Sequence, residues 1–155
     1  MIEATDLFEA HLTVPDLDEA IQFYRDVLGL RLAHVTDSRD GAFFWIGSAG
    51  NAMLGLWAGG SAPVKITSHV AFRVGLADVL DAPRALRSVG ITPLGFDGRP
   101  TDRPDVLAWM PAAAVYFRDP AGHLLEYIAM LLHKACSDCG VLPWRMWELM
   151  QGAAA

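Results

Sequence analysis

The feature that most constrains the fold of this 155-residue chain is an internal repeat. His11 opens the run HLTVPDLDEAIQFYRDVLGL, and His69 opens the run HVAFRVGLADVLDAPRALRSVG. The step from His11 to His69 is 58 residues, and the step from His69 to Glu126, in the segment YFRDPAGHLLEY, is 57. Two near-equal steps indicate a module that is used twice, with a histidine at the start of each copy. Two imidazoles and one carboxylate are also the ligand set of an open divalent-metal site.

The first copy is predicted to be a strand, a helix and three further strands. Residues 8–14 alternate in hydrophobicity as a strand does, and Asp16 with Glu19 forms the capping pattern of a helix start. Gly29 supplies the helix stop. Further strands are expected over residues 30–36, 41–46 and 51–58.

The second copy repeats this pattern. A strand is expected over residues 67–74 and a helix from about Ala77 to Val89, which Gly90 ends. Later strands are expected over residues 91–96, 112–118 and 123–130. A long insertion at about 95–113 is rich in proline, glycine and charge, and loops of this length are usually functional or mobile.

Composition narrows the class of protein. The net charge of −6 and the pI of about 5.2 argue against nucleic acid or an anionic membrane as the partner. The N-terminal residues do not resemble a secretory signal, and no apolar run is long enough to span a membrane, so a reducing cytoplasm is expected. Cys136 and Cys139 are accordingly expected to be reduced thiols, with a redox-active pair or half of a zinc site as the alternatives.

The C-terminal segment, residues 132–155, combines apolar side chains with few charges. Trp144, Met146, Trp147 and Met150 recur at near-helical spacing, which predicts a tail that is helical in part. Because a small domain rarely leaves such a surface in water, the tail is expected to pack on the domain or on a partner. A homodimer with residues 141–151 in the contact is the resulting hypothesis.

HLTVPDLDEAIQFYRDVLGL resembles the opening motif of the vicinal oxygen chelate superfamily, and YFRDPAGHLLEY resembles its closing motif. This superfamily includes glyoxalase I, fosfomycin-resistance proteins, extradiol dioxygenases and bleomycin-resistance proteins. The resemblance implies an α+β fold in residues 1–131, with two βαβββ modules at about 7–60 and 66–131. The modules would form a curved mixed sheet around a cleft with a metal on its floor, followed by the tail.

The resemblance also implies which residues hold the metal. Superfamily ligands come from the first and last strands of each module, which here are His11, the neighbourhood of Gly55, His69 and Glu126. The Gly55 neighbourhood carries no carboxylate, which argues against glyoxalase I activity. The expected cofactor is one divalent ion, Fe, Mn, Ni, Co or Zn, bound by His11, His69 and Glu126.

Two further residues are candidates for catalysis. The resemblance suggests that Tyr116 is a substrate-facing phenol, against the alternative of a core tyrosine with a wet hydroxyl. Thr13 is predicted to share a strand face with His11, so it is a candidate hydrogen-bond donor or an ordinary β-branched strand residue. His123 is assigned to the turn, while Arg99 and Arg103 are either a solvated loop face or a clamp for an anionic substrate.

These features predict a metal-dependent enzyme acting on a small oxygenated substrate that is chelated through adjacent oxygens. The reaction would be that of a dioxygenase, or of a lyase or transferase of the glyoxalase or fosfomycin-resistance type. The alternative is a metal-free protein of the bleomycin-resistance kind that sequesters a small molecule in a cleft lined by aromatic residues. That lining would be Trp45, Trp57, Phe72 and Trp109.

Overall fold

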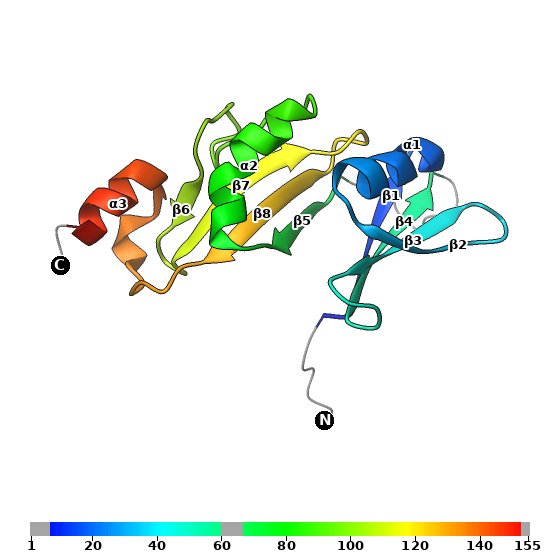
Figure 1. Cartoon of the computed structure of the whole chain (residues 1–155), viewed down its shortest axis with the longest axis horizontal. Coiled ribbons are helices and arrows are strands. Elements are labelled where there is room, and N and C mark those ends of the chain that lie inside the picture. The colour runs from blue at the N-terminus through cyan, green and yellow to red at the C-terminus, as the bar shows by residue number, and fades with distance from the viewer. Residues whose placement is uncertain (1–6, 60–66, 153–155) are drawn as a thin grey trace. The chain divides into compact units, whose positions relative to one another are not determined.

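The computed structural model describes residues 7–59 and 67–152, which form two compact units. The first unit contains the chain up to Ser68 together with the short segment Asp119–His123. The second unit contains His69–Arg118 and the chain from Leu124 onward. Each unit has a β-sheet of its own, with a helix from the same unit on one face (Figure 1).

The first unit is one βαβββ module. Its elements are β1 (Glu9–Val14), α1 (Leu17–Gln22), the π-helical turn η1 (Phe23–Val27), β2 (Arg31–Val35), β3 (Gly41–Ile46) and β4 (Ala52–Ala58). The strand order is β1-β4-β3-β2, and only the β1–β4 pair is parallel.

The second unit repeats this topology and then extends it. Its elements are β5 (His69–Arg73), α2 (Leu76–Ser88), β6 (Asp105–Leu107), β7 (Ala112–Arg118), β8 (Leu124–Met130), the 3-10 turn η2 (Ser137–Cys139), β9 (Val141–Pro143) and α3 (Trp144–Gly152). The order β5-β8-β7-β6-β9 again pairs the module's first and last strands in parallel. The predicted α+β fold of two βαβββ modules with a C-terminal helix is therefore confirmed.

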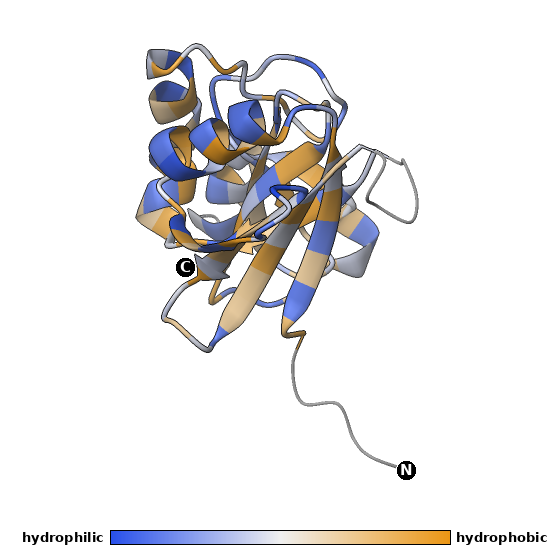
Figure 2. Ribbon diagram, turned by 90° about the vertical axis from the view of Figure 1, so that its right-hand side faces the viewer, coloured by the Kyte–Doolittle hydropathy of each residue, from blue (hydrophilic) through white to orange (hydrophobic). Residues whose placement is uncertain are grey.

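Local chemistry explains where the first helix begins and ends. The Asp16 carboxylate accepts a hydrogen bond from the backbone N–H of Glu19 at 2.9 Å, as the capping pattern predicts. Gly29 has φ +70°, a backbone conformation that favours glycine. Alternation along the strands then separates a buried face from an open one, seen as hydrophobic and hydrophilic bands in Figure 2.

The strand predicted over residues 91–96 is wrong. Only Leu94 makes β-bridges there, to Pro100 and Tyr116. Pro93 has no N–H to donate to a ladder, and the chain reverses at a turn in which the N–H of Gly98 bonds to the carbonyl of Gly95. The module's second strand is instead β6, which lies inside the predicted insertion.

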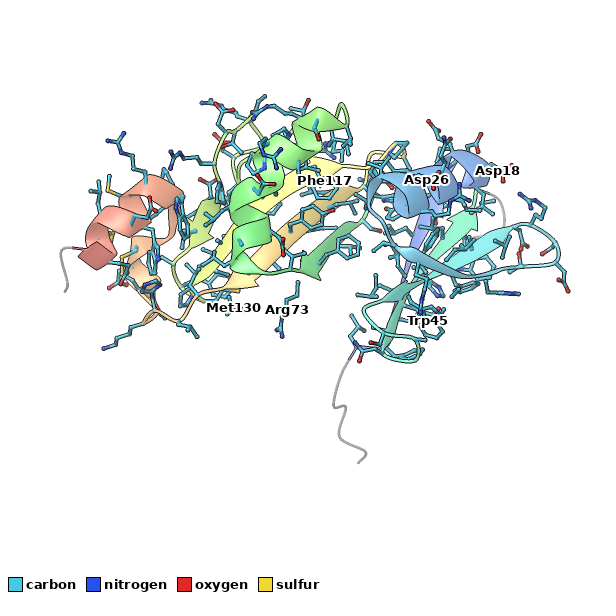
Figure 3. The ribbon with its side chains drawn as sticks, in the orientation of Figure 1. Asp18, Asp26, Trp45, Arg73, Phe117 and Met130 are labelled. Atoms are coloured by element: carbon cyan, nitrogen blue, oxygen red, sulfur yellow. A yellow bond between two sulfur atoms is a disulfide. The ribbon has the colours of Figure 1, made fainter. Side chains whose placement is uncertain are left out.

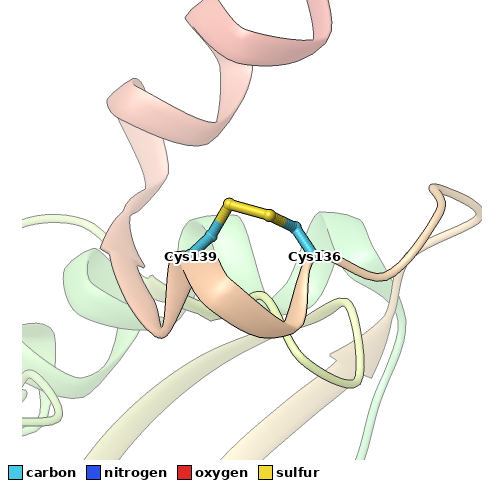
Figure 4. Close-up of a disulfide and its surroundings, with 2 residues drawn as sticks. All are labelled: Cys136 and Cys139. Atoms are coloured by element: carbon cyan, nitrogen blue, oxygen red, sulfur yellow. A yellow bond between two sulfur atoms is a disulfide. The ribbon is translucent and has the colours of Figure 1, made fainter.

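The expectation of two reduced thiols is also wrong, because Cys136 and Cys139 form a disulfide (Figure 4). The η2 turn between them brings their Cα atoms to 5.4 Å, which is within reach of a disulfide. The cysteine turn lies against Ala108, whose carbonyl accepts from the N–H of Cys136 and whose N–H donates to Gly140.

The C-terminal tail folds back on the second unit. Strand β9 pairs antiparallel with β6, and Trp144 and Trp147 of α3 are buried. This arrangement confirms a partly helical tail that packs on its own domain. Among the described residues, no helix has the length and apolar character needed to cross a membrane.

Candidate metal and substrate site

The pleat of β1 and β5 places the two histidines of the repeat on the open faces of their sheets. Along β1, Leu12 and Val14 are buried, while His11 lies on the opposite, exposed face. In β5, Phe72 is buried, while His69 and Arg73 are exposed. Arg73 points away from helix α2 in Figure 3, and His69 shares its face.

In the second unit His69 is paired with Glu126. The Nε2 atom of His69 lies 2.9 Å from Oε2 of Glu126, and 48% of the His69 side chain is exposed against 5% for Glu126. Glu126 sits in the middle of the sheet, opposite Ala71 of β5 and opposite Tyr116 of β7. The Tyr116 ring lies 5.9 Å from the His69 ring between centroids, so the three polar side chains form one cluster.

Burial governs the protonation of this cluster. It raises the pKa of Glu126 above its usual range, while the charge and hydrogen bond of His69 and the nearby Tyr116 hydroxyl act in the opposite direction. Burial also raises the pKa of Tyr116, and the Glu126 charge raises it further. Tyr116 is therefore a protonated phenol that can donate a hydrogen bond.

One oxygen of Glu126 fits a ligated cation. Within the described residues, Oε1 of Glu126 is buried and accepts no hydrogen bond. Leaving a buried acceptor unpaired costs about 1–3 kcal/mol, and more when it is charged, so a bound cation would offset a real cost. A carboxylate oxygen and an imidazole nitrogen are donors that divalent ions of this class accept.

In the first unit both nitrogens of His11 already have partners. The indole Nε1–H of Trp57 donates to Nδ1 of His11 at 3.2 Å, and Nε2 of His11 lies 3.1 Å from Oε1 of Glu9. The imidazole lies directly over Gly55, where an added Cβ would be 2.6 Å from Cδ2 of His11. The space that the missing side chain of Gly55 leaves is thus filled by the His11 ring.

The strand register corrects the position equivalent to Glu126 in the first module. Glu126 lies opposite Ala71, two residues after His69, and Trp57 lies opposite Thr13, two residues after His11. Trp57 therefore occupies the position equivalent to Glu126, which the resemblance had put in the neighbourhood of Gly55. The positions of β4 on this open face are Met53, Gly55 and Trp57, so β4 supplies no carboxylate to it.

The structure thus groups the predicted site residues by unit. His69, Glu126 and Tyr116 come together in the second unit, while His11 and Thr13 belong to the first. Inside either unit, the described part of the chain holds no group of three or more His, Cys, Asp or Glu side chains arranged for a metal ion.

The turn of the closing motif has a structural role that residue spacing only partly revealed. His123 is buried, its Nδ1 accepts from the N–H of Ser68 at 3.0 Å, and its Nε2 lies 2.7 Å from the carbonyl of Thr13. Its assignment to the turn is confirmed. Asp119, which sequence reasoning missed, accepts from the Tyr24 hydroxyl at 2.9 Å and from the N–H of His123 at 2.7 Å.

Residue patterns could have revealed some of the missed contacts. Glu9 lies two residues before His11 and therefore on the same strand face, which is a period-2 signal. The partnership of Tyr24 with Asp119 spans 95 residues and leaves no local signal. Arg99 and Arg103 are exposed, and Arg99 lies 3.7 Å from Asp97, as expected for a solvated loop.

The comparisons with known proteins agree with this fold. The sequence model of the Glyoxalase/Bleomycin resistance protein/Dioxygenase superfamily matches residues 6–127. An integron cassette protein from the mobile metagenome of the Halifax Harbour sewage outfall is 29% identical, with a TM-score of 0.68 over 82% of this chain and 100% of its own. No curated protein sequence matches the chain.

Two more distant solved structures share the fold. Lactoylglutathione lyase from Agrobacterium tumefaciens is 24% identical, with a TM-score of 0.62 over 81% of this chain and 94% of its own. The fosfomycin resistance protein FosX from Mesorhizobium loti is 21% identical, with a TM-score of 0.54 over 85% and 96%. With the superfamily match spanning both repeated modules and the motifs that carry His11 and Glu126, this chain belongs to the glyoxalase/bleomycin resistance protein/dioxygenase superfamily.

Proposed function

We propose that this chain is a metal-dependent enzyme that acts on a small organic substrate bound through two adjacent oxygens. The observation that carries the proposal is the buried Oε1 of Glu126, which lacks a partner among the described residues although Oε2 is paired with His69. Solved structures that share the fold are named as a lactoylglutathione lyase, an oxidase and a fosfomycin resistance protein, and these names supply the range of reactions.

His11, His69 and Glu126 would hold one divalent ion, Fe, Mn, Ni, Co or Zn. When bound, such an ion supplies Lewis-acid chemistry at a substrate oxygen. The protein's own groups then divide the remaining work. Tyr116 is a protonated phenol that donates a hydrogen bond beside Glu126, and Thr13 offers a hydroxyl on the His11 strand face. Trp57 and Phe43 place aromatic rings beside His11.

Metal content is the direct test of this proposal. Full-length protein purified without chelator should contain close to one of these ions per chain. Glu126→Gln should weaken affinity by at least about tenfold, since even supporting residues around a metal are worth that much. Glu148→Gln, an exposed substitution on α3, is the matched control and should bind as the wild type does. Unchanged affinity in Glu126→Gln would refute the role of Glu126.

The second candidate is a metal-free protein that sequesters a small molecule. The observation in its favour is that both nitrogens of His11 are satisfied by Trp57 and Glu9. If wild-type protein binds none of the five ions in elemental analysis and in titration, the metal-dependent proposal is wrong and this candidate takes its place.

We also propose that the protein works as a homodimer. Helix α3 buries Trp144 and Trp147 against its own unit but leaves Met146, Leu149 and Met150 exposed. An apolar row of this kind on a small protein is commonly covered by a second copy.

A further inference from the structure

We propose that Trp57 is a latch on His11, so that His11 can bind a metal ion only after the Trp57 indole has released it. The proposal rests on the metal-dependent function proposed above and adds a residue that controls it. Its basis is the pair of contacts that His11 makes, one at each ring nitrogen.

The two contacts fix one tautomer of His11. An indole N–H is a donor and never an acceptor, so Nδ1 of His11 must present a lone pair to Trp57. The single proton of the neutral imidazole is then on Nε2, where Oε1 of Glu9 lies 3.1 Å away and can accept it. The contacts with Trp57 and with Glu9, one at each ring nitrogen, therefore favour the same Nε2–H tautomer of His11.

Neither nitrogen of His11 can bind a metal in this arrangement. Ligation through Nε2 requires its proton to move to Nδ1, where it would face the Trp57 N–H at 3.2 Å, donor against donor. Ligation through Nδ1 requires the lone pair that Trp57 already uses. The Trp57 contact must therefore break whichever nitrogen binds the metal, whereas the Glu9 contact must break only when Nε2 is the ligand.

The packing around His11 limits how far its ring can turn away from Trp57. The His11 ring is confined by Gly55 beneath it and by Phe43 beside it, with ring centroids 6.0 Å apart. Trp57 is half-buried and touches both of these rings edge-on. Rotation of the indole would also open the His11 face of the strand.

The two modules are consequently unequal. His69 is paired with a carboxylate that can itself become a ligand, while His11 is paired at the equivalent position with a donor that cannot. His69 and Glu126 would therefore hold a divalent ion without the removal of an indole, whereas His11 would hold one only after Trp57 has moved. The release of Trp57 would then be what makes His11 available as a ligand.

The test uses Trp57→Phe, which keeps an aromatic ring but removes the N–H. Zinc is titrated calorimetrically into the metal-free, full-length protein. Since one hydrogen bond is lost from the metal-free state only, Trp57→Phe should bind zinc about two- to tenfold more tightly than wild type. Trp45→Phe is the matched control, because Trp45 lies on the same sheet face opposite Met53 and should leave affinity unchanged.

Nuclear magnetic resonance supplies a readout that does not depend on affinity. In metal-free wild type, the ¹⁵N shifts of His11, assigned by its loss in His11→Gln, should report the Nε2–H tautomer. The indole N–H signal of Trp57, assigned by its loss in Trp57→Phe, should move when zinc is added. The Nδ1–H tautomer, or zinc binding with that indole signal and the affinity of Trp57→Phe both unchanged, would overturn the latch and leave the metal-dependent function standing. No zinc binding in wild type or in Trp57→Phe would overturn both.

Discussion

One register position gives the two modules different chemistry. Where the second module places Glu126 beside His69, the first places Trp57 beside His11, and each side chain contacts its histidine. A carboxylate is negatively charged and can ligate a cation, whereas an indole N–H is only a hydrogen-bond donor and cannot. The first module therefore does more than lack one ligand, because the Trp57 that replaces the carboxylate also occupies Nδ1 of His11.

This substitution predicts weak glyoxalase I activity or none. Proton abstraction from the hemithioacetal of methylglyoxal and glutathione needs a general base, which contributes about 10²- to 10⁴-fold. The β4 face offers Met53, Gly55 and Trp57, none of which can act as that base. Spectrophotometric assays with added Zn, Ni or Co should show turnover lower by about that factor than in an efficient glyoxalase.

Efficient turnover would point to another carboxylate in the first unit. Glu9, at 3.1 Å from His11, is the one that the structure offers. Glu9→Gln would then abolish the activity, with Glu19→Gln, an exposed helix residue, as the control.

At the scale of elements, the turn of the closing motif, residues 119–123, is hydrogen-bonded to parts of the chain that are distant in sequence. Asp119 receives hydrogen bonds from Tyr24 in η1 and from the backbone of His123, and His123 in turn contacts Ser68 and Thr13. All of these groups lie within the first unit, although the turn connects β7 and β8 of the second. The Asp119–His123 turn is therefore held in place by the buried side chains of Asp119 and His123.

Removing the Tyr24 hydroxyl should destabilise this turn. Tyr24 is fully buried, and a hydrogen bond to a charged acceptor contributes about 1.5–3 kcal/mol. Tyr24→Phe should lower the free energy of unfolding by an amount in that range, measured by urea titration. Tyr127→Phe, in β8, removes a hydroxyl elsewhere and should cost less than Tyr24→Phe. Equal losses in the two variants would show that the Asp119 contact contributes nothing special.

At the scale of the whole molecule, sequence periodicity predicted the two repeated modules and their main helices. It could not predict features that depend on contacts between residues distant in sequence. The spacing of His11, His69 and Glu126 predicted two modules, and the capping pattern at Asp16 located the first helix. Hydrophobic alternation could not exclude the strand at 91–96, because the reversal after Pro93 depends on backbone hydrogen bonds. The resemblance named His69 and Glu126 together as ligands, whereas the contact of Trp57 with His11 could be found only from the strand register.

In the C-terminal tail, too, the helix was predictable from the sequence, whereas its packing was not. Near-helical spacing of tryptophan and methionine predicted a helix, and the pairing of β9 with β6 explains why part of that apolar surface is already covered. Deleting the tail after Lys134 would remove β9 and two buried tryptophans, so it would damage the second sheet as well as any dimer contact. A surface substitution is the cleaner probe.

Leu149→Glu should convert a dimer into a monomer. Leu149 is 61% exposed, Met146 lies three residues before it on the same helix face, and the exposed Met150 follows it directly. A carboxylate buried at a contact between copies would have no partner and would carry a large desolvation cost. Light scattering across a concentration series should give twice the chain mass for wild type and the chain mass for Leu149→Glu. Glu148→Lys, which changes charge on the other side of the helix, should remain dimeric. A wild type that is monomeric throughout the series, or a Leu149→Glu that stays dimeric, would show that α3 covers no second copy.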